Sequence, residues 1–118
     1  MVVQIDATQI RDWETFHTVF SAAFGFPSFY GRNMDAWIDC MTYLDDPAAE
    51  MSDVHVPRGT VLTIQLDHVD EFIAHCPQQY RALIECSAFV NWRRLEQGDP
   101  SVLALSFYKA SDFGPQAG

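Results

Sequence analysis

Two carboxylates, Asp35 and Asp39, lie four positions apart in the stretch FPSFYGRNMDAWIDCMTYLDD, residues 26–46. Neither is followed three or four residues later by a basic side chain that would neutralise it. Like charges at this spacing cost an isolated helix about 0.2–0.5 kcal/mol. Paired carboxylates act as acid and base in many hydrolases, but two acids one turn apart on one helix face rarely close over a substrate. The pattern therefore favours a charged binding surface over catalysis.

A second cluster, His68, Glu71 and His75, has the spacing i, i+3 and i+7. One helix face would then offer three metal ligands, but the spacing matches neither HExxH nor HxxEH. A solvated polar helix face is the simpler interpretation, and a metal-dependent enzyme is kept as a third hypothesis for function. The chain also lacks a glycine-rich phosphate loop and a GxSxG motif. We therefore expect no enzyme activity, no cofactor and no metal.

The charge balance favours a cationic partner. Seven Lys and Arg stand against sixteen Asp and Glu, which gives a net charge of −9 with His neutral. Such a chain repels nucleic acid, whose binding depends on the neutralisation of phosphates. Complementary charge would instead steer a basic partner toward it. An acidic composition also serves solubility alone, so the positions of the acids must decide between the two interpretations.

Length and composition predict a single globular domain in the cytoplasm. A chain of 118 residues with 48% hydrophobic content can bury about two-thirds of its unfolded surface. There is no run of about eighteen apolar residues that would predict a membrane span, and the first residues, MVVQIDATQIRDWE, lack a signal-peptide pattern. The three cysteines, Cys40, Cys76 and Cys86, fit buried reduced thiols, although their spacing leaves a disulfide open.

The apolar pattern predicts the helices and strands that must position the two acids, in the order β-α-α-β-α-α-β. They form one predicted domain, residues 1–109, followed by a C-terminal tail, 110–118. Strands are predicted at 2–5, 60–66 and 102–108, and helices at 13–24, at 34–44, after an Asp67 cap, and at 78–97. Strands joined through helices imply a parallel sheet, with the second and third strands at its centre. We expect a small α/β domain whose three-stranded parallel sheet is covered by about four helices.

The helix patterns also predict which side chains are buried. Trp37 lies on the apolar stripe of the second helix and is assigned to the core, and the stretch 45–59, with two prolines, is predicted to be a loop. Arg93 and Arg94, near the end of the long fourth helix, are interpreted as partners of the helix dipole. That helix is expected to bury six apolar side chains: Tyr80, Leu83, Ile84, Phe89, Val90 and Leu95.

The segment Tyr30–Leu44, YGRNMDAWIDCMTYL, resembles the loop and second helix of the barstar family, intracellular protein inhibitors of the ribonuclease barnase. The shared pattern is Tyr-Gly-x-Asn-apolar-Asp-Ala after an aromatic residue, then Asp-Cys and a Thr, and it extends upstream through Gln9-Ile10 and His17 to Pro27. The likeness is specific over roughly the first 45 residues. Beyond them it rests on element order, because the family's parallel three-stranded sheet with covering helices agrees with the order predicted above.

The resemblance implies binding rather than catalysis. In that family the second helix and the loop before it plug the active site of a basic ribonuclease, one inhibitor to one enzyme, with acids in the places of RNA phosphates. Carried over residue by residue, Asp39 is the central anion and Asp35 the second. The other contact residues that the resemblance implies are Phe29, Tyr30, Gly31, Asn33, Ile38, Thr42, Tyr43, Leu44 and Asp46.

Two of these residues also have a structural reason to be where they are. Asn33 is a good helix N-cap, and Asp35 in the first turn is favoured by the helix dipole. Asp39, in the middle of the helix, has no such local reason. We therefore select Asp39 as the principal binding residue.

Several positions depart from the family pattern. Arg32 stands where the family is acidic, Ile38 replaces a tryptophan, and Phe29 replaces a tyrosine. The loop 45–59 is longer than the family's connection, and Arg93 aligns near a glutamate that the family contributes from its fourth helix. These departures keep a second hypothesis open, in which a barstar-like fold serves as an immunity or regulatory module for a different basic toxin or enzyme.

Overall fold

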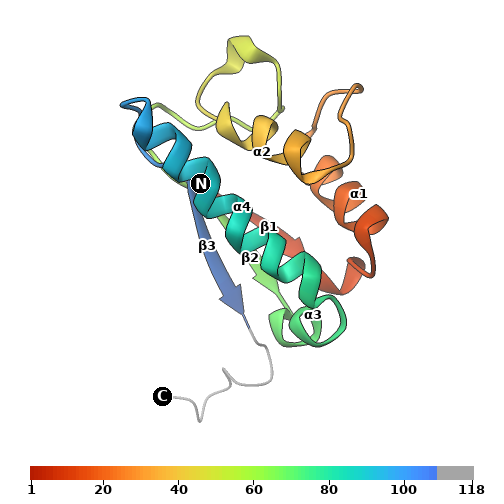
Figure 1. Ribbon diagram of the computed structural model, residues 1–118. Helices are drawn as coiled ribbons and strands as arrows, with labels where there is room; N and C mark the ends of the chain where they lie inside the picture. Colours follow the sequence, from red (N-terminus) through yellow and green to blue (C-terminus); the bar gives the residue numbers. More distant parts are fainter. Residues whose placement is uncertain (109–118) are drawn as a thin grey trace, which may run out of the picture.

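The computed structural model describes residues 1–108, so the predicted tail at 110–118 lies outside the described residues. Three strands and four α-helices follow one another in the predicted order β-α-α-β-α-α-β, and two short 3-10 helices lie in the connections (Figure 1). The elements are β1 (Val2–Asp6), η1 (Ala7–Gln9), α1 (Trp13–Phe24), α2 (Met34–Thr42), η2 (Pro47–Ala49), β2 (Leu62–Asp67), α3 (Val69–His75), α4 (Pro77–Glu96) and β3 (Leu103–Tyr108). The predicted α/β fold is confirmed.

The sheet is parallel throughout, with the strand order β1-β2-β3. The prediction was right for β2, which is central, and wrong for β3, which lies at an edge. One face of the sheet is apolar, because Ile64 of β2 aligns with Val3 of β1 and Leu105 of β3. The next row along the strands, Gln4, Gln65 and Ser106, is polar and lies on the opposite face. The helices therefore have a single sheet face to cover.

The core joins this apolar face to all four α-helices, with Phe72 as the contribution of α3. Phe16 and Phe20 of α1, Trp37 of α2, and Leu83 and Val90 of α4 all belong to one buried cluster with the sheet residues. Trp37 is fully buried, as predicted, and its ring meets that of Phe20 edge to face at 5.8 Å. Each helix thus contributes one apolar stripe and leaves its opposite side to solvent.

The ends of α1 follow the predicted signals. The Asp12 carboxylate accepts a hydrogen bond from the backbone N–H of Thr15 at 2.8 Å, and the Thr15 hydroxyl oxygen accepts one from the Asp12 N–H, which completes a capping box. Gly25 ends the helix in the left-handed conformation, with φ of 64°. A capped start and a glycine stop fix where the chain turns toward the next helix.

Two other helix boundaries differ from the prediction. Asp67 does not cap α3, because it is the last residue of β2 and pairs with Asp6; His68, at φ of 60°, makes the turn into the helix instead. The second helix ends at Thr42, two residues earlier than predicted, and Tyr43 takes the C-cap position. At Asp67 the strand pairing overrides the local capping signal.

The buried face of α4 was predicted only in part. Leu83 and Val90 are buried, but Phe89 and Leu95 are 43% and 58% exposed, so the prediction was wrong for these two. The residues that continue the buried stripe are polar: Ser87 and Arg94 are 4% exposed each. The prediction relied on the apolar type of these residues. The helical spacing of α4 instead places an arginine inside and two large apolar side chains outside.

The stretch 45–59 is tied to the ends of α1 and α2 rather than free. Its Ser52 hydroxyl and Asp53 N–H both donate to the Phe24 carbonyl, at 2.7 and 2.9 Å, and the N–H of the buried Val56 donates to the Leu44 carbonyl at 3.0 Å. The predicted loop is therefore a packed segment that braces the C-terminal end of α2.

Gly25 offers a test of this packing, because a methyl group there would meet Asp53 at 2.4–2.7 Å. We expect Gly25→Ala to lower the free energy of unfolding by about 1–2 kcal/mol for the left-handed conformation and by about 1–3 kcal/mol more for the clash. Gly98→Ala is the matched control, since Gly98 has φ of 83° and open space around it. Equal losses for the two variants in urea denaturation would show that the contact with Asp53 is unimportant.

Candidate functional site

The loop before α2 positions the start of the candidate site. Asn33 has extended backbone angles, and its side-chain oxygen accepts a hydrogen bond from the Ala36 N–H at 2.8 Å, so its predicted N-cap role is confirmed. Its side-chain N–H donates back to the Gly31 carbonyl at 3.3 Å. Asp35 lies in the first turn, where the helix dipole favours an acid. The cap therefore fixes the loop at the start of α2, next to the turn that carries Asp35.

The structure separates the candidate residues by exposure. Those exposed to solvent are Phe29, Gly31, Asn33, Asp35, Asp39, Tyr43 and Asp46; Tyr30 and Ile38 are half-buried; Thr42 and Leu44 are buried. Phe29 is 73% exposed, more than any other large apolar side chain among residues 1–108. Leu44 is fully enclosed in the core, so the expected contact from this residue is wrong. The residues that remain open form an acidic surface with an aromatic edge.

Tyr30 is directed into the protein. Its hydroxyl forms a 2.5 Å hydrogen bond with Nδ1 of His17, and its ring packs on Phe26 with 4.7 Å between the centroids. Burial raises the pKa of the Tyr30 hydroxyl. Burial also lowers the pKa of His17, with the Arg32 charge acting in the same direction. This pair links α1 to the loop that carries the candidate site, a link that the sequence did not reveal.

Arg32 is turned back onto α1. Its Nη2 donates to the Glu14 carbonyl at 2.9 Å and to the Thr18 hydroxyl at 2.8 Å, and its backbone has a positive φ of 53°. The cation that departs from the family pattern therefore ties the loop to the first helix.

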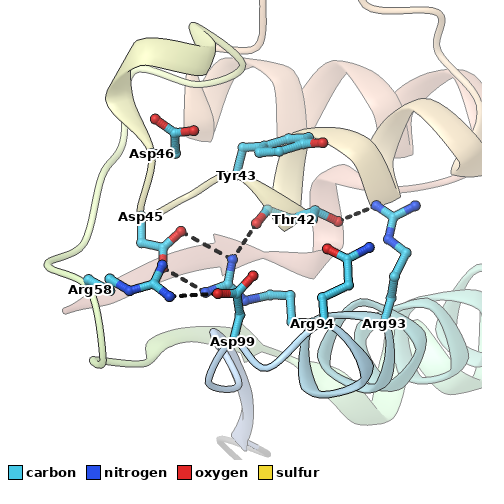
Figure 2. A pocket seen from close by; sticks show the side chains of 9 residues that line it. Thr42, Tyr43, Asp45, Asp46, Arg58, Arg93, Arg94 and Asp99 are labelled. Atoms are coloured by element: carbon cyan, nitrogen blue, oxygen red, sulfur yellow. Dashed lines mark hydrogen bonds and ion pairs between the residues drawn. The ribbon is translucent and has the colours of Figure 1, made fainter.

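Asp39 has a cationic neighbour that the sequence gave no sign of. Nη2 of Arg93, on α4, lies 3.5 Å from Oδ1 of Asp39 and donates to the Thr42 hydroxyl at 2.5 Å. Figure 2 shows Arg93 reaching from α4 toward the end of α2. The Asp39 side chain is still 55% exposed. Asp39 is thus open to a partner and already beside one positive charge, which corrects the expectation of an unpaired acid and of Arg93 as only a dipole partner.

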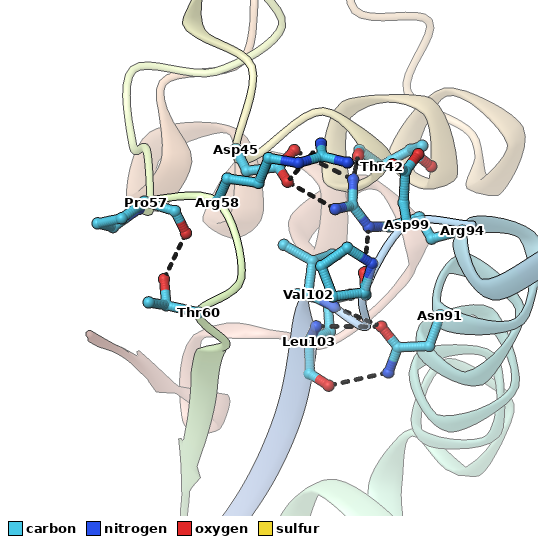
Figure 3. Close-up of polar contacts among 11 residues, drawn as sticks. Thr42, Asp45, Pro57, Arg58, Thr60, Asn91, Arg94, Asp99, Val102 and Leu103 are labelled. Carbon is cyan, nitrogen blue, oxygen red and sulfur yellow. Dashed lines mark hydrogen bonds and ion pairs between the residues drawn. The ribbon is translucent and has the colours of Figure 1, made fainter. Parts of the chain in front are cut away.

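Arg94, the next residue, forms a buried cluster at the end of α2. Its guanidinium donates to both carboxylate oxygens of Asp45, at 2.6 and 3.1 Å, and both side chains are 5% exposed. It also donates to the Thr42 carbonyl at 2.7 Å, as Figure 3 shows, and to the Pro100 carbonyl at 2.8 Å. The hydrogen bonds from Arg94 to the Asp45 carboxylate hold the pKa of Asp45 below its ordinary value. The cluster joins the last turn of α2 to α4 and to the segment before β3.

A polar cavity of about 400 Å³ opens beside this cluster. Tyr43 and Asp46 lie on one side of it, and Arg58, which forms a 2.6 Å ion pair with Asp99, lies on another. As Figure 2 shows, the dashed contacts in this cavity join residues of its own walls. The cavity therefore extends the charged surface of α2 but brings together no group with the arrangement of a catalytic site.

The metal-dependent alternative finds no geometric support. Within residues 1–108, no three side chains of His, Cys, Asp or Glu lie close enough together to hold a metal ion. His68 precedes α3 as its N-cap, whereas Glu71 lies in the first turn and His75 in the last. Over the same residues, no helix combines the length and apolar character needed to cross a bilayer.

Comparison with known families identifies the fold. The profile described as Barstar (barnase inhibitor) matches residues 1–106. The chain belongs to the barstar family. The suspected resemblance is confirmed, and the match covers both the α2 surface and the Arg93–Arg94 end of α4. Individual curated proteins give no match. The barstar family consists of inhibitors rather than enzymes, and its description names barnase as the target.

Two features of this barstar-family surface, the burial of Arg94 and the contact of Arg93 with Asp39, were not predicted from the sequence. Arg94 carried a usable signal, because it continues the stripe of Leu83, Ser87 and Val90 at helical spacing, and an arginine on a buried stripe requires an acid. The Arg93–Asp39 contact carried none, because the two residues are 54 positions apart and no local spacing relates one to the other.

The Arg94–Asp45 pair leads to a stability prediction. We expect Arg94→Met to lower the free energy of unfolding by about 3–5 kcal/mol. The buried Asp45 charge then keeps only the exposed Arg58, 3.9 Å away, as a cation. The double variant Arg94→Met with Asp45→Leu should lose less than the single variant, since no unpaired charge remains. Urea denaturation of the two proteins measures the difference. A double variant less stable than the single one would contradict a dominant ion pair.

His17 leads to a pH prediction. Its pKa is lower in the folded protein than the ordinary value of 6.5, so the unfolded chain takes up the proton first as the pH falls. The stability that neutral His17 contributes is therefore complete above about pH 6.5 and is lost as the pH falls through the lower folded pKa. The advantage of wild type over His17→Gln, measured by urea denaturation from pH 8 to 5, should shrink in acid. A constant difference would contradict this assignment.

Proposed function

We propose that this chain inhibits a small secreted ribonuclease by covering its active site with α2 and the loop before it, in a one-to-one complex formed in the cytoplasm. The observation that carries the proposal is the pair Asp35 and Asp39, exposed on a helix whose opposite side is locked into the core. A ribonuclease holds cations where phosphate charge develops. Carboxylates on a fixed helix form charge-assisted hydrogen bonds to such groups.

The surroundings of the two acids support a protein partner. Phe29, Tyr43 and Asp46 lie exposed on the same segment, and aromatic side chains are enriched where proteins bind each other. The capping Asn33 and the Arg94 cluster hold both ends of α2, so the acids are placed before the partner arrives. A net charge of −9 steers a basic protein toward this surface and disfavours nucleic acid.

A second candidate function keeps the fold and changes the partner. Arg93 adds a positive charge beside Asp39, and a wholly basic active site fits such a surface less well. An immunity or regulatory module for another basic toxin or enzyme would account for it. Inhibition of RNA cleavage, tested on barnase and a panel of small secreted ribonucleases, separates the two candidates.

Removal of the Asp39 carboxylate tests the proposal directly. We expect Asp39→Ala to weaken binding to the inhibited ribonuclease by about 2–4 kcal/mol, as the loss of an interface hot spot does, with little change in the free energy of unfolding. Isothermal titration calorimetry measures the affinity.

Glu71→Ala is the control for net charge, because it removes one exposed acid from α3, away from the proposed surface. Its affinity should equal that of wild type. Equal affinity of Asp39→Ala and wild type would contradict the acidic surface as the binding site.

A further inference from the structure

Arg93 is held in place at the exposed boundary between α2 and α4. Its Nη2 donates to the Thr42 hydroxyl and lies 3.5 Å from Oδ1 of Asp39. Its guanidinium carbon lies 5.9 Å from the centroid of the Phe89 ring, within the range of a cation–π contact. The side chain is 30% exposed. Three separate contacts on one guanidinium make Arg93 a fixed part of the surface.

This arginine still has hydrogen-bonding capacity to offer. A guanidinium carries five N–H donors, and both of the side-chain hydrogen bonds of Arg93 start from Nη2. Among the residues that the structure describes, its Nε and Nη1 have no hydrogen-bond partner. An incoming carboxylate could therefore bind Arg93 without displacing its contacts to Thr42 and Asp39.

A partner that approaches Asp39 must also meet Arg93. A second cation brought to Asp39 would lie close to the fixed guanidinium, and like charges in contact across an interface cost affinity. An acidic group beside that cation would remove the repulsion and bind the open donors, because carboxylates form bidentate contacts with arginine. The surface therefore contains both an attractive and a repulsive element, the combination by which proteins discriminate between related partners.

We propose that Arg93 sets the choice of partner: the chain favours a ribonuclease that carries an acidic side chain next to the cation facing Asp39, and it discriminates against one whose facing surface is wholly basic. This inference rests on the proposed function and deepens it. In the favoured complex the partner's cation faces Asp39 and its acidic side chain faces Arg93. The pattern of charges, rather than the total charge, then decides binding.

Charge changes at position 93, with barnase as the basic probe, test the inference. Affinity should rise from wild type to Arg93→Gln and again to Arg93→Glu, by at least about tenfold over the series. Arg81→Gln and Arg81→Glu are matched controls, because Arg81 is exposed on the same helix and has no ion pair or side-chain hydrogen bond within residues 1–108. Calorimetry at low and high salt measures the affinities, and circular dichroism checks that every variant folds.

The outcomes distinguish the inference from the function. A rise at position 93 beyond that of the Arg81 controls supports the inference, even where wild type itself binds barnase weakly. Inhibition by wild type with no greater response at position 93 than at 81 overturns the inference and leaves the function standing. A failure of wild type and Arg93→Glu to inhibit barnase or any member of a panel of secreted ribonucleases overturns both.

A second arm uses the ribonuclease that wild type binds most tightly in that panel. Arg93→Gln should lose at least about threefold in affinity for this enzyme, since the enzyme's acid then lacks its cation. A gain in affinity there, as with barnase, would overturn the inference.

Discussion

The buried ion pair between Arg94 and Asp45 is the interaction on which the candidate site depends. One guanidinium binds the carboxylate of Asp45, the last carbonyl of α2 at Thr42, and the carbonyl of Pro100 before β3. Thr42 and Asp45 lie at the end of α2, whereas Pro100 lies just before β3, so their common partner on α4 fixes the end of α2 against α4 and the sheet. A buried charge without its counter-ion is costly, and this cost keeps the helix in one position.

With α2 fixed at both ends, its solvent side becomes a surface of defined charge. Trp37 and Met41 hold the inner side in the core, while Asp35 and Asp39 project outward. Arg93, next to Arg94 on the same helix, is carried to the edge of this surface by the same packing. The two adjacent arginines thus have different roles: the buried Arg94 positions α2, and the more exposed Arg93 changes the charge of the surface that α2 presents.

Local patterns in the sequence were enough to predict the order of elements, the parallel sheet, the capping of α1 and the burial of Trp37, because each depends on short-range spacing and on turn residues. Contacts between distant segments were not predictable in this way. The Asp39–Arg93 and Tyr30–His17 pairs join residues 54 and 13 positions apart with no repeating signal. The prediction that Phe89 and Leu95 are buried failed for a different reason, since it followed residue type rather than the helical spacing that continues the buried stripe to Arg94.

Nuclear magnetic resonance mapping of the complex tests whether α2 and the loop before it form the binding surface. The isotope-labelled chain would be titrated with an unlabelled ribonuclease that it inhibits, and the backbone amide shifts followed residue by residue. The changes should concentrate between residues 29 and 46 and on α4 around Arg93. Changes concentrated on α3 or on the polar sheet face of Gln4, Gln65 and Ser106 would contradict it.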